Sequence, residues 1–182
     1  MNITAVPPLR RIGVCLLATA LAAFLFRGPI AEGIATRGDV EFQNGRAERA
    51  LKFYGRAARY DIGSNVAVER LTTLAFMSGN KHLMTRAAEF ADAHLAVRPN
   101  DAAVLQNLAF IERKLGRVAD SDRDFARVAS LTPDANVVEF SARRALARGD
   151  RRTAIDLYHR ALALDPNRPS ARAALARLEP RV

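Results

Sequence analysis

Few residues of this chain have the type and spacing that chemistry requires. The three histidines, His82, His94 and His159, are not spaced as metal ligands. Cys15 is the only cysteine, so no disulfide can form within the chain. The sequence contains no glycine-rich phosphate loop and no nucleophile elbow. We therefore expect no catalytic residues, no metal site and no cofactor, and a protein that is not an enzyme.

Three aspartates form the one acidic pattern that could suggest a cation site. Asp120, Asp122 and Asp124 alternate along the chain, but a calcium loop also needs a turn glycine and a terminal glutamate, which are missing here. The surrounding pattern predicts a helix. We interpret the three carboxylates as a solvated helix face, with Arg123 and Arg127 nearby.

A recurring spacing indicates the elements that position these side chains. It is clearest from Gly149, where the chain continues through Ala154, Tyr158 and Ala161 to Pro166. Residues three and four apart share one face of a helix. The spacing therefore predicts a loop glycine, an amphipathic helix and a proline stop.

The same spacing occurs three more times upstream, in imperfect form. The glycines that open the four copies are 34, 37 and 33 residues apart. The upstream copies are Gly45, Ala50, Tyr54, Ala57 and Ile62; Gly79, Ala87, Ala91, His94 and Pro99; and Gly116, Ser121, Phe125, Val128 and Pro133. Four copies in phase indicate an internal repeat.

This pattern resembles the second half of a tetratricopeptide repeat (TPR), a helix–turn–helix unit of about 34 residues. The resemblance implies an all-α fold: a right-handed α-solenoid of about four TPR-like helix pairs and a C-terminal capping helix, preceded by one N-terminal hydrophobic helix. The expected organisation is an anchor over 1–30, repeats over 31–64, 65–101, 102–134 and 135–168, and a cap and tail over 169–182.

Local signals give the expected helix ends. We expect the first helix to run from about Ala31 to Gln43, with a glycine turn after it. The second pair should open with Asn65–Ser78. Asp101 is a good N-cap for the helix that opens the third pair. The short stripe Ser170–Leu178 is well placed to cover the last face of the array.

The N-terminus carries an uncharged run over residues 12–26, preceded by Arg10 and Arg11. Its length at about 1.5 Å per residue is roughly 22 Å, which is short for a bilayer span but within reach of snorkelling arginines. We favour a retained signal-anchor. The chain would then be a single-pass protein of the cytoplasmic membrane in a bacterial envelope, with its repeats on the outer side of that membrane. The alternative is a secreted protein whose signal peptide is cleaved after Ala35.

The formal net charge is +9, carried almost entirely by arginine. A basic balance is compatible with binding to nucleic acid or to an anionic surface. The arginines are spread along the chain, and the aromatic residues fall mostly on packing positions rather than where bases would stack. Nucleic acid is therefore an unfavoured partner.

The resemblance implies that the first helix of each pair lines a concave groove that binds protein segments. We expect a scaffold or adaptor for protein–protein interactions, with an acidic or amphipathic segment as partner and the lipid bilayer contacted through residues 12–26. The expected groove residues are Gln106, Asn107, Phe110, Arg113, Lys114, Glu139 and Arg143, with Glu69, Thr73, Phe76 and Leu146 beside them.

Overall fold

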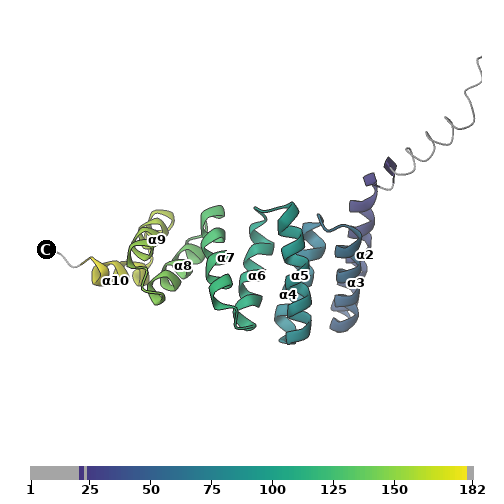
Figure 1. Cartoon of the computed structure of the whole chain (residues 1–182), viewed down its shortest axis with the longest axis horizontal. Coiled ribbons are helices and arrows are strands. Elements are labelled where there is room, and N and C mark those ends of the chain that lie inside the picture. The colour runs from purple at the N-terminus through teal and green to yellow at the C-terminus, as the bar shows by residue number, and fades with distance from the viewer. Residues whose placement is uncertain (1–20, 23, 180–182) are drawn as a thin grey trace, which may run out of the picture. The chain divides into compact units, whose positions relative to one another are not determined.

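The computed structural model describes residues 21–22 and 24–179, and this part of the chain contains helices and no strands. The helices are α2 (Arg27–Gln43), α3 (Ala47–Tyr60), α4 (Asn65–Ser78), α5 (Lys81–Val97), α6 (Ala102–Lys114), α7 (Val118–Leu131), α8 (Ala135–Ala147), α9 (Arg151–Leu164) and α10 (Pro169–Leu178) (Figure 1). The chain divides into two compact units, 1–67 and 68–182, with the division inside α4. The all-helical class expected from the sequence is confirmed.

A glycine follows the first helix of each of the four helix pairs, as the repeated spacing predicts. Gly45, Gly79, Gly116 and Gly149 all have positive φ, between 65° and 84°. A side chain is strained in this left-handed region, whereas glycine adopts it freely. The chain can therefore reverse direction within two or three residues and lay the second helix of each pair against the first.

The residues of the repeated spacing form the interior. In the last complete pair, Ala154, Tyr158 and Ala161 are buried and pack with Ala142 and Ala145 of α8. The corresponding residues of the other copies are buried as well, namely Ala50, Tyr54, Ala57, Ala87, Ala91, His94, Ser121, Phe125 and Val128. Small residues let the two helices of a pair approach closely, and one aromatic or bulky residue fills the remaining space.

Aspartates cap the first turns of α6 and α8, and the cap of α6 is the one that the sequence predicts. The Asp101 carboxylate accepts from the backbone N–H of Val104 at 3.2 Å, and its other oxygen lies 2.9 Å from Nε2 of buried His94. Asp134 accepts from the N–H of Asn136 at 2.8 Å at the start of α8. Each carboxylate satisfies a donor that the first turn of a helix leaves without a partner.

The first helix begins earlier than expected. α2 starts at Arg27 rather than near Ala31, so it includes Pro29. Proline lacks an N–H donor, but the N–H groups of a first turn have no acceptor within the helix, so proline is tolerated there. The final helix, α10, matches the expected cap closely: Ala171 and Leu175 are buried against α9.

Most of the apolar run over 12–26, and with it the predicted anchor, lies outside the described residues. Within residues 21–22 and 24–179, no helix combines the length and the apolar character needed to cross a bilayer. The last residues of the run that the structure describes are strongly exposed: Leu21, Phe24, Leu25 and Phe26 are between 57% and 66% exposed.

The interpretation of the three aspartates as a solvated face is wrong for two of them. Asp122 and Asp124 are 4% and 7% exposed. Residues two apart on a helix point to different sides, so alternate aspartates cannot share one face. Asp122 contacts Arg144 Nε at 2.7 Å and Arg148 Nη1 at 3.1 Å, so its carboxylate joins α7 to α8.

Candidate interaction surface

Three phenylalanines from successive first helices form a row on the second unit. The centroids of the Phe76 ring of α4 and the Phe110 ring of α6 are 5.6 Å apart. Phe110 lies 6.4 Å from the Phe140 ring of α8. Each of the three is only partly buried. We call Phe76, Phe110 and Phe140 the aromatic row.

A fourth ring supports the row from below. Phe125 of α7 is 2% exposed, and its ring packs edge-on against Phe110 at 4.9 Å and against Phe140 at 4.6 Å. Aromatic pairs in this edge-to-face arrangement are stabilised beyond their buried area. Two of the three residues of the row therefore pack on a buried ring, while both remain partly exposed to solvent.

Asn107 fixes the register between α4 and α6. Its amide nitrogen donates to the hydroxyl of Thr73 at 2.9 Å and to that of Thr72 at 3.1 Å, and lies 3.4 Å from the carbonyl oxygen of Glu69. The sequence predicted Asn107 as a groove residue. The structure gives it this positioning contact, which aligns Phe76 with Phe110.

Basic side chains lie at the end of α6. Lys114 Nζ is 5.9 Å from the centroid of the Phe76 ring, a cation–π distance. Arg113 and Lys114 are exposed, and Gln106 is partly buried on the same helix. The ion pairs within residues 21–22 and 24–179 include no carboxylate for Arg113 or Lys114. Both charges are therefore available to a ligand.

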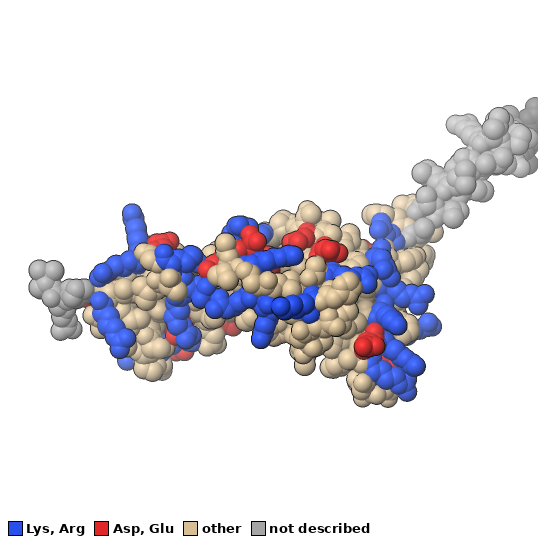
Figure 2. Space-filling model, turned by 60° about the horizontal axis from the view of Figure 1, so that its bottom comes forward, with Lys and Arg blue, Asp and Glu red and all other residues tan. Residues whose placement is uncertain are grey.

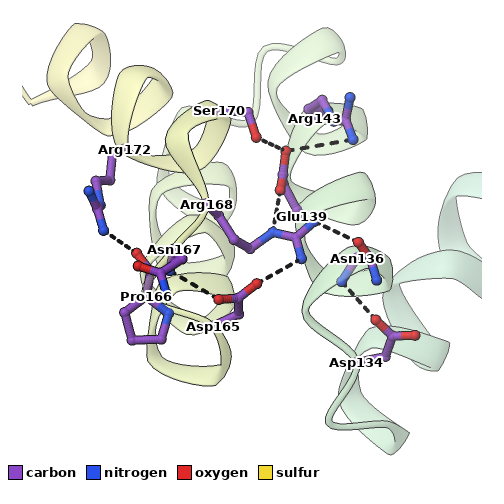
Figure 3. A network of polar contacts seen from close by, with 10 residues as sticks. All are labelled: Asp134, Asn136, Glu139, Arg143, Asp165, Pro166, Asn167, Arg168, Ser170 and Arg172. Atoms are coloured by element: carbon purple, nitrogen blue, oxygen red, sulfur yellow. Dashed lines mark hydrogen bonds and ion pairs between the residues drawn. The ribbon is translucent and has the colours of Figure 1, made fainter.

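Glu139 and Arg143 lie in a different environment. The Glu139 carboxylate is buried, accepting from Arg168 Nε at 2.6 Å and from the Ser170 hydroxyl at 2.7 Å. Arg143 lies 3.6 Å from the same carboxylate, and Arg168 also donates to the Asn136 side-chain oxygen at 2.8 Å. Figure 3 shows Glu139 at the centre of this network, with Arg143, Arg168 and Ser170 directed toward it.

The network sets the charge state of Glu139. Burial alone would raise the pKa of this carboxyl, but the Ser170 and Arg168 hydrogen bonds and the two cations outweigh it and lower the pKa. Glu139 therefore joins α8 to the segment that begins α10. Of the seven predicted groove residues, the structure groups Asn107, Phe110 and Lys114 around the aromatic row, with Gln106 and Arg113 on the same helix.

Phe140 is the residue of this surface that the sequence analysis missed. Phe76 and Phe110 are separated by 34 residues and Phe140 follows 30 residues later, so a search for aromatic residues at the repeat period would have come close to it. Its position on α8, beside Glu139, was visible in the sequence, but its packing against Phe125 of the preceding helix was not.

Among the comparisons with known proteins, those with solved structures show the fold. No family model matches the chain, and no curated protein matches its sequence. Solved structures do match. A tetratricopeptide repeat protein from Parabacteroides merdae superposes with a TM-score of 0.64 at 16% identity, covering 84% of this chain and 60% of that protein.

Two further solved structures show the same similarity. PilF of Pseudomonas aeruginosa gives a TM-score of 0.60 at 22% identity, covering 84% of this chain and 68% of PilF. MamA of Desulfovibrio magneticus RS-1 gives 0.60 at 14% identity, covering 77% of this chain and 78% of that one. At these identities the similarity establishes a TPR-like fold, and the function has to be argued from the surface.

Proposed function

We propose that this protein is a membrane-tethered TPR-like scaffold that binds a segment of a partner protein on the aromatic row. The observation that carries the proposal is the row itself: three partly exposed rings on first helices, flanked by Arg113 and Lys114. Exposed aromatics next to available cations fit a segment with apolar and acidic side chains. The TPR-like fold supports a role in protein–protein interaction, and the role that we propose is not enzymatic.

The tether is the second part of the proposal. The sequence places an uncharged run after Arg10 and Arg11, which favours a single span with the repeats outside the cytoplasmic membrane of a bacterium. A secreted form with a cleaved signal peptide would keep the repeats on the same side. Retention of the full chain in membranes after alkaline carbonate washing distinguishes these forms, and a reporter fused after Val182 tests the side of the membrane on which the repeats lie.

Site-specific crosslinking tests the binding surface. A photoreactive residue at position 106, on the same helix as Arg113 and Lys114, should capture a partner in native membranes, whereas one at Ala126, which is exposed on α7, should not. Replacing Arg113 and Lys114 with glutamate should abolish the crosslink. The matched control replaces Arg86 and Arg152, which are exposed elsewhere, with glutamate; this variant has the same net charge and should crosslink normally.

The salt dependence of binding gives a second test. Exposed charges are screened over about 10 Å at 0.1 M salt, so the interaction should weaken as salt is added. If both charge-reversed variants bind alike, with the same salt dependence as the unmodified protein, the aromatic row is not the binding surface.

A further inference from the structure

The first unit contains a hollow that the proposed function does not use. It has a volume of about 500 Å³ and lies between α2 and α3. Its lining consists of three arginines and three apolar or aromatic residues: Ile34, Arg37, Phe53, Arg56, Arg59 and Tyr60. A hollow of this size accommodates a small ligand or a lipid headgroup. Figure 2 shows basic side chains on the surface of this unit, as along the rest of the visible face.

The three arginines of the hollow have no acidic partners in the described part of the chain. Arg37, Arg56 and Arg59 are exposed, and the ion pairs of α2 and α3 involve other arginines, such as Arg46 with Glu41 at 3.2 Å. Three like charges around one hollow repel each other. A bound anion would relieve this repulsion, and the planar guanidinium group suits a phosphate because it can donate two parallel hydrogen bonds.

An exposed apolar segment adjoins the hollow. Leu21, Phe24, Leu25, Phe26 and Ile30 are each more than 40% exposed. A cluster of apolar side chains that are this exposed marks a surface that another apolar phase covers. These five residues lie directly before α2 or in its first turn, and α2 also supplies Ile34 and Arg37 to the hollow.

Arg27 connects the apolar segment to the hollow. Its guanidinium Nε and Nη2 atoms each lie 3.4 Å from the carbonyl oxygen of Tyr60, a hollow residue. The same guanidinium group lies 6.0 Å from the centroid of the Phe24 ring. The exposed rings and the cationic hollow are therefore held beside each other within one unit.

We propose that the hollow binds the phosphate headgroup of an anionic phospholipid, such as phosphatidylglycerol. Arg37, Arg56 and Arg59 would pair with the phosphate, while Phe53 and Tyr60 would contact the glycerol backbone. A phospholipid is the ligand that joins an anionic group to an apolar phase, which matches both halves of the site. An acidic protein segment would neutralise the arginines but would leave the apolar side chains of Leu21, Phe24, Leu25, Phe26 and Ile30 exposed.

This inference rests on the proposed membrane attachment and adds to it a preference for one class of lipid. The test uses the full chain, purified in a non-ionic detergent and mixed with equal amounts of phosphatidylglycerol and phosphatidylcholine. Native mass spectrometry then counts the two kinds of adduct. The unmodified protein should carry mainly phosphatidylglycerol.

The decisive variant replaces Arg37, Arg56 and Arg59 with glutamine. A basic residue near an anionic lipid surface contributes about 1 kcal/mol, so losing three should reduce the lipid preference by about 100-fold at low salt. The control replaces Arg86, Arg152 and Arg177, three exposed arginines outside the hollow, and should keep the preference. Lysine at the three hollow positions should preserve part of it, because the charge remains.

Four results would overturn the proposal. The first is equal binding of the two lipids by the unmodified protein, and the second is an equal loss in the hollow variant and its control. The third is displacement of phosphatidylglycerol by millimolar glycerol 3-phosphate, which would assign the hollow to a soluble phosphate. The fourth is displacement by a micromolar peptide of alternating glutamate and leucine, which would assign it to a protein segment.

Failure of this inference can be told from failure of the proposed function. A full chain that alkaline carbonate releases from membranes lacks the proposed tether. A chain that stays in the membrane but shows no lipid preference keeps the tether and lacks only the headgroup site.

Discussion

The ring of Tyr54 occupies the space above the backbone of Gly38. A β-carbon at position 38 would lie 2.5 Å from Cε1 and 2.7 Å from Cδ1 of this ring, closer than atoms can approach. Tyr54 is 3% exposed, and its hydroxyl donates to Asp39 Oδ1 at 2.8 Å. The ring is therefore fixed at both ends, and the separation of α2 and α3 depends on the absence of a side chain at position 38.

Substituting Gly38 by alanine should destabilise the protein. The added methyl group cannot fit without moving the tyrosine ring or separating the two helices, and overpacking of this kind costs about 1–3 kcal/mol. Urea unfolding followed by circular dichroism measures the change. Gly33→Ala is the matched control, since position 33 lies on the same helix with open space around it. It should stabilise the protein by about 0.5–1 kcal/mol, because alanine favours helix more than glycine does. Equal effects of the two changes would contradict the packing described here.

Removing Arg168 should cost more stability than removing Arg143. Both arginines contact the buried Glu139 carboxylate, but Arg168 does so at 2.6 Å and is 16% exposed, whereas Arg143 lies at 3.6 Å and is 60% exposed. Arg168→Met leaves a buried charge poorly compensated, which costs about 3 kcal/mol or more. Arg143→Met should cost less than about 1 kcal/mol, as for other exposed pairs. Thermal unfolding of the two variants tests this order, and a reversed order would show that the network is misassigned.

Stability should fall as the pH rises from about 4.5 to about 7. Burial, together with the nearby carboxylates of Asp124, Asp120 and Asp92, raises the pKa of Glu112 to about 7, against the opposing effect of Arg117. One carboxylate oxygen of Glu112 is buried without a hydrogen-bond partner. The raised pKa means that the folded state binds this proton more tightly than the unfolded state does. Between pH 4.5 and 7 the folded state therefore carries more protons than the unfolded state, so raising the pH in this range lowers the free energy of unfolding.

The same reasoning applies to two neighbours and gives the control. Burial also raises the pKa values of Asp92 and Asp124, which adds to the decrease in the same direction. Glu112→Gln should flatten the dependence of urea midpoint on pH between 5 and 8 and should raise stability at pH 8. Glu89→Gln, which removes an exposed carboxylate from α5, should leave the slope as it is. A midpoint that rises from pH 5 to pH 8 in the unmodified protein would refute this assignment.

Truncating Tyr158 tests the interior of the repeats. Its ring is 2% exposed and packs with Ala142, Ala145 and Leu175, so Tyr158→Ala should cost about 3–5 kcal/mol. Leu164→Ala changes a residue of the same helix that is 39% exposed and should cost less than about 1 kcal/mol. Differential scanning calorimetry distinguishes the two. A silent Tyr158→Ala would place the repeat interior elsewhere.

The fold could be predicted from the sequence because it depends on local signals. The glycine of each turn, the small residues at repeat spacing and the capping aspartate Asp101 are all short-range features, and each took the expected conformation. The helix Asn65–Ser78 has the expected ends. The start of α2 was missed because Pro29 looks like a helix stop unless its place in the first turn is known.

The candidate surface was harder to predict because it depends on side-chain partners far along the chain. Glu139 and Arg143 have the spacing of exposed residues on a first helix. The Glu139 carboxylate is nevertheless buried, because it pairs with Arg168, 29 residues away. Asp122 is a similar case, since Arg144 and Arg148 of the next pair bury it. The side on which a charged residue lies depends on the partner that the neighbouring helix offers, and the helical period alone does not contain this information.

The packing of each helix on its neighbours along the chain has a consequence for folding. α2 packs on α3, α6 on α7 and α8 on α9, so the contacts join residues close in sequence. Chains with such low contact order fold quickly, because only short loops have to close before the contacts form. As the chain emerges from the machinery that makes or exports it, the Tyr54 ring can reach Gly38 before the later helices have emerged. The order of assembly then follows the order of the pairs in the sequence.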